Sequence, residues 1–366
     1  MNKIKEYNMI KDLSIKRLMA VMVACFSVMA VTLSSCTGAA GEAGNILSGD
    51  STVVRVKFQT PSAYSVSTKS TRALSSTNEN NVDNLYIMVF DGSGNLVGCN
   101  YTAFSTPQSS AFTANVTVHE DATCTIYALA NIDQSALSGV TSIGKLDSLS
   151  LSIDSAADLG NKNDIAMFGK VGNIDVSSIT DTNIPSITLQ RMESRMDVSI
   201  TPGSGITITG YHLCNIPTSS YVADSTLTGG RYNPAGKYVS FPEVSGLSMT
   251  SSFTDIYYMY ENKVGKNANA ITQMLRTTAN APANATYVTI WATGSNWTSE
   301  YKIYLGGPSD DTTDYDIERN SHYTYNIEIN GQGANDVRVI ETTAIFPGST
   351  VSDWQNATGS SVSSYN

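Results

Sequence analysis

Short stretches of alternating apolar and polar side chains run through the chain and predict β-strands. The first such stretch covers residues 52–59, with the sequence T-V-V-R-V-K-F-Q. One face of this stretch carries Val54, Val56 and Phe58, and the other carries Val53 and two basic residues. A period of two residues is typical of a strand with one buried face.

Similar stretches follow, separated by turns rich in Gly, Asn, Asp and Pro. Residues 135–159 are expected to hold a short helix or a loop excursion, and residues 217–240 a polar loop. Many short strands at this spacing are typical of β-sandwiches, and 366 residues suffice for two domains. The sequence therefore predicts an all-β protein with two sandwich-like domains. Further strands are expected at residues 84–90, 96–97, 111–118, 124–131, 165–168, 187–189, 196–200, 206–213, 255–260, 287–293, 297–304, 322–329 and, in pieces, 336–354.

The N-terminus has the pattern of an export signal. Basic residues precede the apolar stretch 18–33, which is too short to span a membrane comfortably. The stretch ends in Leu33-Ser34-Ser35-Cys36, which resembles the bacterial lipobox. This predicts a signal peptide over residues 1–35 and a lipid-modified Cys36. A plain signal peptide followed by an incidental cysteine is the alternative.

The net charge of −10 is unevenly distributed along the chain. Residues 1–72 hold nine basic and four acidic residues, so the remainder has a net charge of −15. No basic patch is visible in this remainder, which argues against nucleic-acid binding. An acidic surface suits an exposed, self-repelling protein.

Candidate chemistry is sparse, and no catalytic, cofactor or metal site is expected. The three histidines lie in or beside strand patterns, and no hydrolase, metalloprotease or phosphate-loop motif is present. A pair of carboxylates, as in glycosidases, is not excluded by the sequence. Trp291 and Trp297 could stack on sugars, although packing on a β-sheet face explains them more simply. Cys99, Cys124 and Cys214 form no C-x-x-C pair and are best explained as core residues, while one disulfide among them stays open.

Four places in the chain together resemble the FimA-type fimbrillins, the stalk subunits of Bacteroidetes type V pili. The first is Cys36 with the following strand and the Arg72-Ala73 junction. The other three are Val82–Asp91 with Tyr127–Asn131, then Tyr257–Asn262, and finally Ile317–Asn320 through Tyr323, Ile327, Ile329, Gly331 and Gly333 to Val351–Trp354.

The resemblance implies two tandem transthyretin-like β-sandwich domains and assembly by donor-strand exchange. It implies a propeptide over residues 36–72, domains over 73–190 and 191–366, and an outer-membrane lipoprotein as precursor. An arginine-specific surface protease would cut between Arg72 and Ala73 and release the strand that carries Val54, Val56 and Phe58. A strand within residues 336–354 of a neighbouring subunit would replace it. Its candidate side chains are Val337, Val339, Ile345, Phe346, Val351 and Trp354.

The sequence therefore predicts a non-enzymatic shaft subunit of a surface fimbrium that supports adhesion, with other fimbrial subunits as partners. A fimbrial tip or minor subunit is the alternative within the family. A monomeric glycan-binding surface lipoprotein is the alternative from another class. Pro347-Gly348 divides the C-terminal segment, which fits either a bent two-part donor or an ordinary hairpin.

Overall fold

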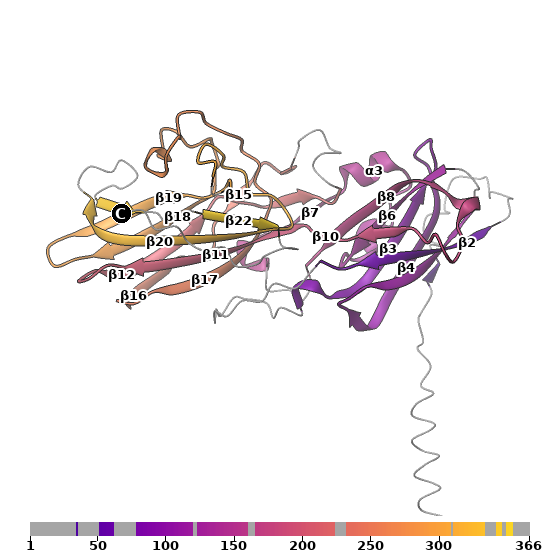
Figure 1. Ribbon diagram of the computed structural model, residues 1–366, viewed down its shortest axis with the longest axis horizontal. Helices are drawn as coiled ribbons and strands as arrows, with labels where there is room; N and C mark the ends of the chain where they lie inside the picture. The colour runs from indigo at the N-terminus through magenta and orange to yellow at the C-terminus, as the bar shows by residue number, and fades with distance from the viewer. Residues whose placement is uncertain are drawn as a thin grey trace, which may run out of the picture. The chain divides into compact units, whose positions relative to one another are not determined.

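The computed structural model confirms an all-β protein with few helices (Figure 1). The described residues belong to one compact unit. The domain boundaries expected from the sequence stay a prediction. The structure describes residues 34–35, 51–61, 78–119, 123–159, 165–223, 232–308, 310–333, 342–345 and 349–353.

The strands before Met192 form a nine-stranded sheet, apart from one short strand in the helical region. The strand order is β10-β8-β6-β3-β4-β5-β2-β9, with β1 paired to β4. The bounds are β1 (Ser34–Ser35), β2 (Thr52–Gln59), β3 (Val82–Phe90), β4 (Leu96–Gln108), β5 (Phe112–Val118), β6 (Thr123–Ala130), β8 (Met167–Asp175), β9 (Ser186–Thr188) and β10 (Gln190–Arg191).

Strand β3 is buried on both faces, which explains its long apolar run. Leu85 and Ile87 pack in one buried cluster with side chains of β2, β5 and β6. Tyr86 and Met88, on the opposite face, pack in a second cluster with Leu146 and other residues of the helical region. The helices are α2 (Gln134–Leu137) and α3 (Ile143–Ser148), with the short strand β7 (Ser150–Ser152) after them.

The strands from Glu193 onward form two larger sheets that share one hydrophobic cluster. One sheet has the order β17-β11-β20-β21, with β22 also paired to β20, and the other has the order β16-β12-β18-β19. The bounds are β11 (Glu193–Pro202), β12 (Thr207–Cys214), β16 (Val244–Met249), β17 (Phe253–Tyr260), β18 (Tyr287–Thr293), β19 (Thr298–Tyr304), β20 (Ser321–Gly333), β21 (Thr342–Ile345) and β22 (Ser349–Asp353).

Short elements fill the connections. Strands β14 and β15 lie within the segment expected to be a polar loop; β14 pairs with β7, and β15 pairs with β13. The remaining bounds are β13 (Ile216–Pro217), β14 (Ser219–Tyr221), β15 (Tyr238–Val239) and the 3-10 turns η1 (Asn78–Asn80), η2 (Ala156–Asp158), η3 (Val176–Ser178) and η4 (Gln273–Leu275).

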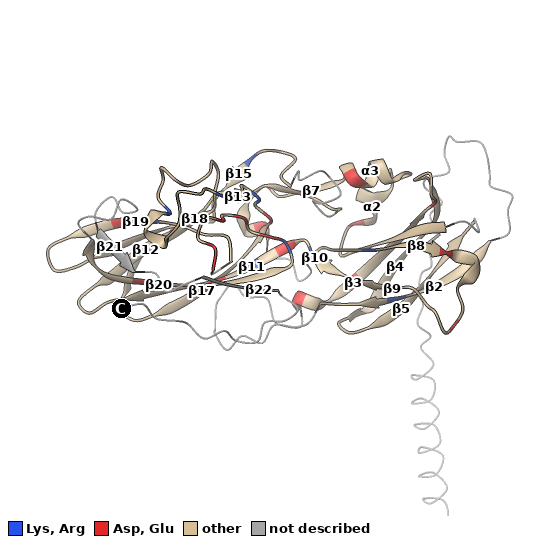
Figure 2. Cartoon of the chain, turned by 45° about the horizontal axis from the view of Figure 1, so that its top comes forward, with Lys and Arg blue, Asp and Glu red and all other residues tan. Residues whose placement is uncertain are grey.

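Charged residues are scattered along the described chain (Figure 2). No continuous basic stretch is visible in the described part of the chain in this view (Figure 2). Within the same residues, no helix is both long and apolar enough to cross a membrane.

Candidate functional site

Strand β2 is inserted between two other strands of its sheet. It pairs antiparallel with β5, from Thr52 opposite Val118 to Phe58 opposite Phe112. On its other side it pairs in parallel with β9 through residues 57–59. The strand predicted at residues 52–59 is therefore confirmed, and it is hydrogen-bonded on both edges.

The inward side chains of β2 are part of the core. Val54, Val56 and Phe58 are all 0% exposed, and Phe58 stacks on Phe112 with ring centroids 5.3 Å apart. Val53, on the outward face, is 65% exposed. Burial stabilises the fold by about 1.5–3 kcal/mol for each inward side chain. The attachment rests on side-chain alternation and a backbone ladder, which another strand of similar pattern could also supply.

The neighbours of β2 depend on it. In the described sheet, β5 pairs with β4 only at Gly98 and Val118, whereas seven of its residues pair with β2. Removal of β2 would expose the backbone of β5 and β9 and the apolar groove beneath. An incoming strand would restore both kinds of contact.

The chain re-enters the described structure at η1, where Glu79 is buried at the centre of a polar cluster. Its carboxylate accepts hydrogen bonds from Arg195 Nη1 at 2.6 Å and from the Tyr258 hydroxyl at 2.5 Å. Its backbone oxygen accepts a bond from Arg191 Nε at 2.8 Å. Arg191 also donates to the side chain of Asn80. We name these residues, Glu79, Asn80, Arg191, Arg195 and Tyr258, the Glu79 anchor.

Through Arg195, the Glu79 anchor is connected to two further buried residues, Asp197 and His322. Arg195 Nε donates to Asp197 Oδ1 at 2.8 Å, and His322 Nε2 lies 3.2 Å from the same oxygen. Burial of Asp197 opposes ionisation, but the bonds from His322 and Arg195 outweigh it and lower its pKa. A carboxylate held in this way keeps its charge and its contacts in neutral solution.

Asn131 holds the residues that directly follow η1 in place. Its side chain donates to Asn81 O at 2.7 Å and to Ile165 O at 2.9 Å, and it accepts from Asp83 N at 2.9 Å. Its φ of 58° lies in the left-handed region, which asparagine tolerates better than most residues. This gives a physical reason for the asparagine in the Tyr127–Asn131 motif.

Two other motifs from the sequence analysis meet through side chains. Glu261, which ends the Tyr257–Asn262 motif together with Asn262, forms a buried ion pair with Arg319. Asn262 Nδ2 donates to Asn284 O and to Thr286 Oγ1, both at 2.9 Å. The motifs therefore hold the loops at the ends of β17 and β20 together.

The C-terminal segment lies along one edge of β20. Ile345, in β21, is opposite Glu328, and Val351, in β22, is opposite Tyr323. Both strands run antiparallel to β20, with one more residue between them than on β20, so they form a two-part strand rather than a hairpin with each other. The other predicted donor side chains, Val337, Val339, Phe346 and Trp354, lie outside the described residues. So do Cys36, Arg72 and Ala73.

The cysteines correct one expectation. Cys124 and Cys214 are buried thiols, as expected of core residues, so neither takes part in the disulfide left open above. Cys99 is disulfide-bonded.

The enzyme alternatives gain no support from the described geometry. His322 contacts Asp197 beside the Glu79 anchor, and His119 is exposed. The described residues hold no group of three or more His, Cys, Asp or Glu that could bind a metal. The Trp297 ring packs so closely on Gly294 that a Cβ there would lie 2.3 Å from it, which favours packing over sugar stacking.

Residues 52–209 match the family model of the major fimbrial subunit protein FimA. The resemblance to the FimA-type fimbrillins is confirmed. The match begins at Thr52, the first residue of β2, so the matched residues include this strand. A second match covers residues 257–327 and corresponds to a domain of unknown function, DUF4906. Among the curated proteins, none matches this sequence.

Solved structures share the fold of this chain. A candidate cell adhesion protein from Parabacteroides distasonis ATCC 8503 is 16% identical with a TM-score of 0.58, and the match covers 84% of this chain and 98% of that one. The tip fimbrial protein Mfa3 from Porphyromonas gingivalis, with a C-terminal truncation, is 17% identical with a TM-score of 0.54, and the match covers 81% of this chain and 100% of that one. The fimbrilin FimA from Porphyromonas gingivalis W83 is 12% identical with a TM-score of 0.50, and the match covers 78% of this chain and 92% of that one. At these identities the likeness shows the fold alone.

Proposed function

We propose that the chain is a structural subunit of a surface fimbrium, which polymerises by strand exchange after proteolysis and supports adhesion. The observation that carries the proposal is β2, a fully integrated strand with which the FimA match begins. The role is structural rather than enzymatic. Tandem transthyretin-like sandwiches, divided near residue 190, are part of the same proposal.

The export steps come first. Residues 1–35 act as the signal peptide, and Cys36 receives the lipid that holds the precursor in the outer membrane. More than one acyl chain is needed for stable anchoring. With β2 in place, the slot between β5 and β9 is filled, so the precursor does not polymerise.

Proteolysis then separates β2 from the rest of the chain. An arginine-specific surface protease cuts between Arg72 and Ala73, which lie between β2 and the Glu79 anchor in sequence. The released part carries Val54, Val56 and Phe58, and the retained part begins a few residues before Glu79. The cut therefore falls between a strand attached by its pattern and a segment attached by specific buried bonds.

Residues 336–354 of a neighbouring subunit then enter the slot. In the single chain, β21 and β22 pair with β20 along one edge, whereas a strand in the slot pairs with both β5 and β9. The gain of a second ladder favours transfer to the neighbour. Since each subunit has one slot and one donor, the contact is head-to-tail and produces a filament.

A fimbrial tip or minor subunit is the second candidate. Its support is the fold, which resembles the tip protein Mfa3 as closely as it resembles FimA. A tip subunit would accept a donor strand but would lie at one end of the polymer.

N-terminal sequencing of protein sheared from cells, beside an Arg72→Ala variant, tests the proposal. A mature end at Ala73, with the variant retained as an unpolymerised lipoprotein, is the expected result. A mature end at lipidated Cys36 with no surface polymer in either strain would contradict it. That outcome would favour a monomeric surface lipoprotein that keeps its own strand.

A further inference from the structure

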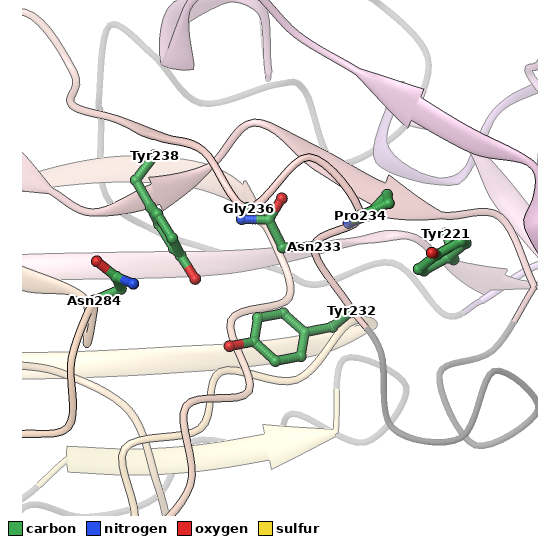
Figure 3. A pocket seen from close by; sticks show the side chains of 7 residues that line it. All are labelled: Tyr221, Tyr232, Asn233, Pro234, Gly236, Tyr238 and Asn284. Atoms are coloured by element: carbon green, nitrogen blue, oxygen red, sulfur yellow. The ribbon is translucent and has the colours of Figure 1, made fainter.

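A pocket of about 470 Å³ lies in the second half of the chain, away from β2 in sequence (Figure 3). Its volume is within the range of about 300–1,000 Å³ that is usual for small-ligand sites. In Figure 3 the rings of three tyrosines are spread along the pocket, with the amide of Asn284 beside Tyr238. The lining residues are Tyr221, Tyr232, Asn233, Pro234, Gly236, Tyr238 and Asn284.

One wall of the pocket is a turn that four hydrogen bonds hold in place. Ser219 Oγ, on β14, donates to Asn233 Oδ1 at 2.8 Å and accepts from Ala235 N at 3.0 Å. Asn233 Nδ2 donates to Lys237 O at 3.0 Å, and Gly236 N donates to Asn233 O at 3.1 Å. The turn is therefore set before any ligand arrives, which lowers the entropic cost of binding.

The side chains of the described residues that line the pocket carry no charge. Burial, followed by Tyr238 and by the negative charge of Asp316 nearby, raises the pKa of Tyr232, so its phenol stays neutral in ordinary buffers. The lining side chains include three phenols and two carboxamides, and neither acidic nor basic groups. A phosphate or carboxylate ligand would find no cation among these residues. A wholly apolar ligand would make no use of the phenol and amide groups.

Phenols and carboxamides both donate and accept hydrogen bonds, which matches the hydroxyl groups of a sugar. The C–H face of a sugar ring is apolar and slightly positive, so it can lie on the negative face of a tyrosine ring. An extended peptide would instead need an open strand edge or a long groove. We propose that this pocket binds a neutral saccharide. The proposal is independent of strand exchange, because none of the lining residues belongs to β2, β5, β9 or the C-terminal segment.

The test uses the intact chain and saturation-transfer NMR with defined probes. The neutral probes are galactose, mannose, N-acetylglucosamine and lactose, and the charged counterparts are glucuronic acid and sialyllactose. Monosaccharides report recognition of a single sugar residue, and lactose reports recognition of a chain end. At least one neutral probe should bind, and the charged probes should bind more weakly.

Two variants locate the binding. Asn284→Gly removes the carboxamide and suits the φ of 63° at this position, and Tyr232→Phe removes a phenol while the ring stays. Each should weaken binding about five- to tenfold, as expected for one hydrogen bond. Asn269→Ala, at an exposed asparagine that does not line the pocket, is the matched control and should leave affinity unchanged.

Absence of binding by every neutral probe would overturn the proposal. So would binding that Asn284→Gly leaves unchanged, or equal binding of charged and neutral probes. Asn284 is exposed, so its variant is expected to fold even if Tyr232→Phe does not.

Discussion

Strand β2 and the Glu79 anchor lie on opposite sides of the proposed cut, and they are attached in different ways. The buried face of β2 consists of three apolar side chains, and its edges bond through backbone groups. The Glu79 anchor consists of buried charges and amides, each aimed at a particular partner. A strand with alternating apolar residues can replace the first kind of attachment. A generic strand has no group that could replace Glu79, so the proposed exchange would replace β2 and leave the anchor in place.

The largest expected effect comes from the anchor. Arg195→Met leaves the buried Glu79 and Asp197 without their cation, and we expect it to lower the free energy of unfolding by about 3–5 kcal/mol. Urea denaturation of the precursor measures this. The control is Lys266→Met, which removes a 2.7 Å ion pair with Asp311 in which Lys266 is 59% exposed, and solvent screening should make its effect on stability far smaller. Equal losses in the two variants would show that the anchor carries no special weight.

Truncation on the buried face of β2 comes next. Phe58→Ala leaves a cavity beside Phe112 and should destabilise the precursor by about 3 kcal/mol. Val53→Ala, on the exposed face of the same strand, should change stability by less than about 0.5 kcal/mol. After β2 is exchanged for another strand, the effect of Phe58→Ala should vanish. A loss that persists in the exchanged protein would mean that β2 had not left.

Asn131 separates backbone conformation from hydrogen bonding in the retained segment. Asn131→Gly keeps access to positive φ but removes the bonds to Asn81, Asp83 and Ile165, and a loss of about 2 kcal/mol is expected. Asn131→Ala adds backbone strain and should be worse than the glycine variant. If neither variant changed the stability measured by thermal denaturation, the residues around η1 would be held by the Glu79 anchor alone.

Low pH should have the smallest of these effects, and it should weaken the contacts of the Glu79 anchor but not the apolar contacts of β2. The pKa of Asp197 is lower in the folded chain than the value of about 3.9 in an unfolded chain. The stabilisation from its ionised form is therefore complete above about pH 4 and is lost as the pH falls below that value. Asp197→Asn should flatten this part of the stability profile measured by denaturation at several pH values. Val54, Val56 and Phe58 do not titrate, so the same variant should leave strand exchange unchanged.

The sequence predicted the strands whose alternation or apolar run is clear. Residues 52–59 match β2 in full, and 287–293 match β18, because period-two patterns and long apolar runs are local signals. Strand β4 is much longer than expected, since its second half, through Gln108, is polar and mostly exposed. Strands β14 and β15 were missed for a similar reason, because they are very short and lie in a polar segment.

The anchor could not be predicted, because its partners are distant in sequence. Glu79 and Arg195 are 116 residues apart, and nothing in the sequence around either one identifies the other. A buried charge looks like a surface charge until the fold places it. The strand β2 could therefore be predicted from the sequence, whereas the Glu79 anchor could be found only in the structure.

Hydrogen exchange tests the central claim most directly. The purified chain is cut with an arginine-specific protease and incubated with a peptide of residues 336–354 or with a scrambled peptide. With the native peptide, residues 52–59 should leave and β5 should stay protected, while Glu79, Asn80 and β3 keep their protection throughout. With the scrambled peptide, residues 52–59 should stay bound. If they also stay bound with the native peptide, or if β3 loses protection when they leave, the account is wrong.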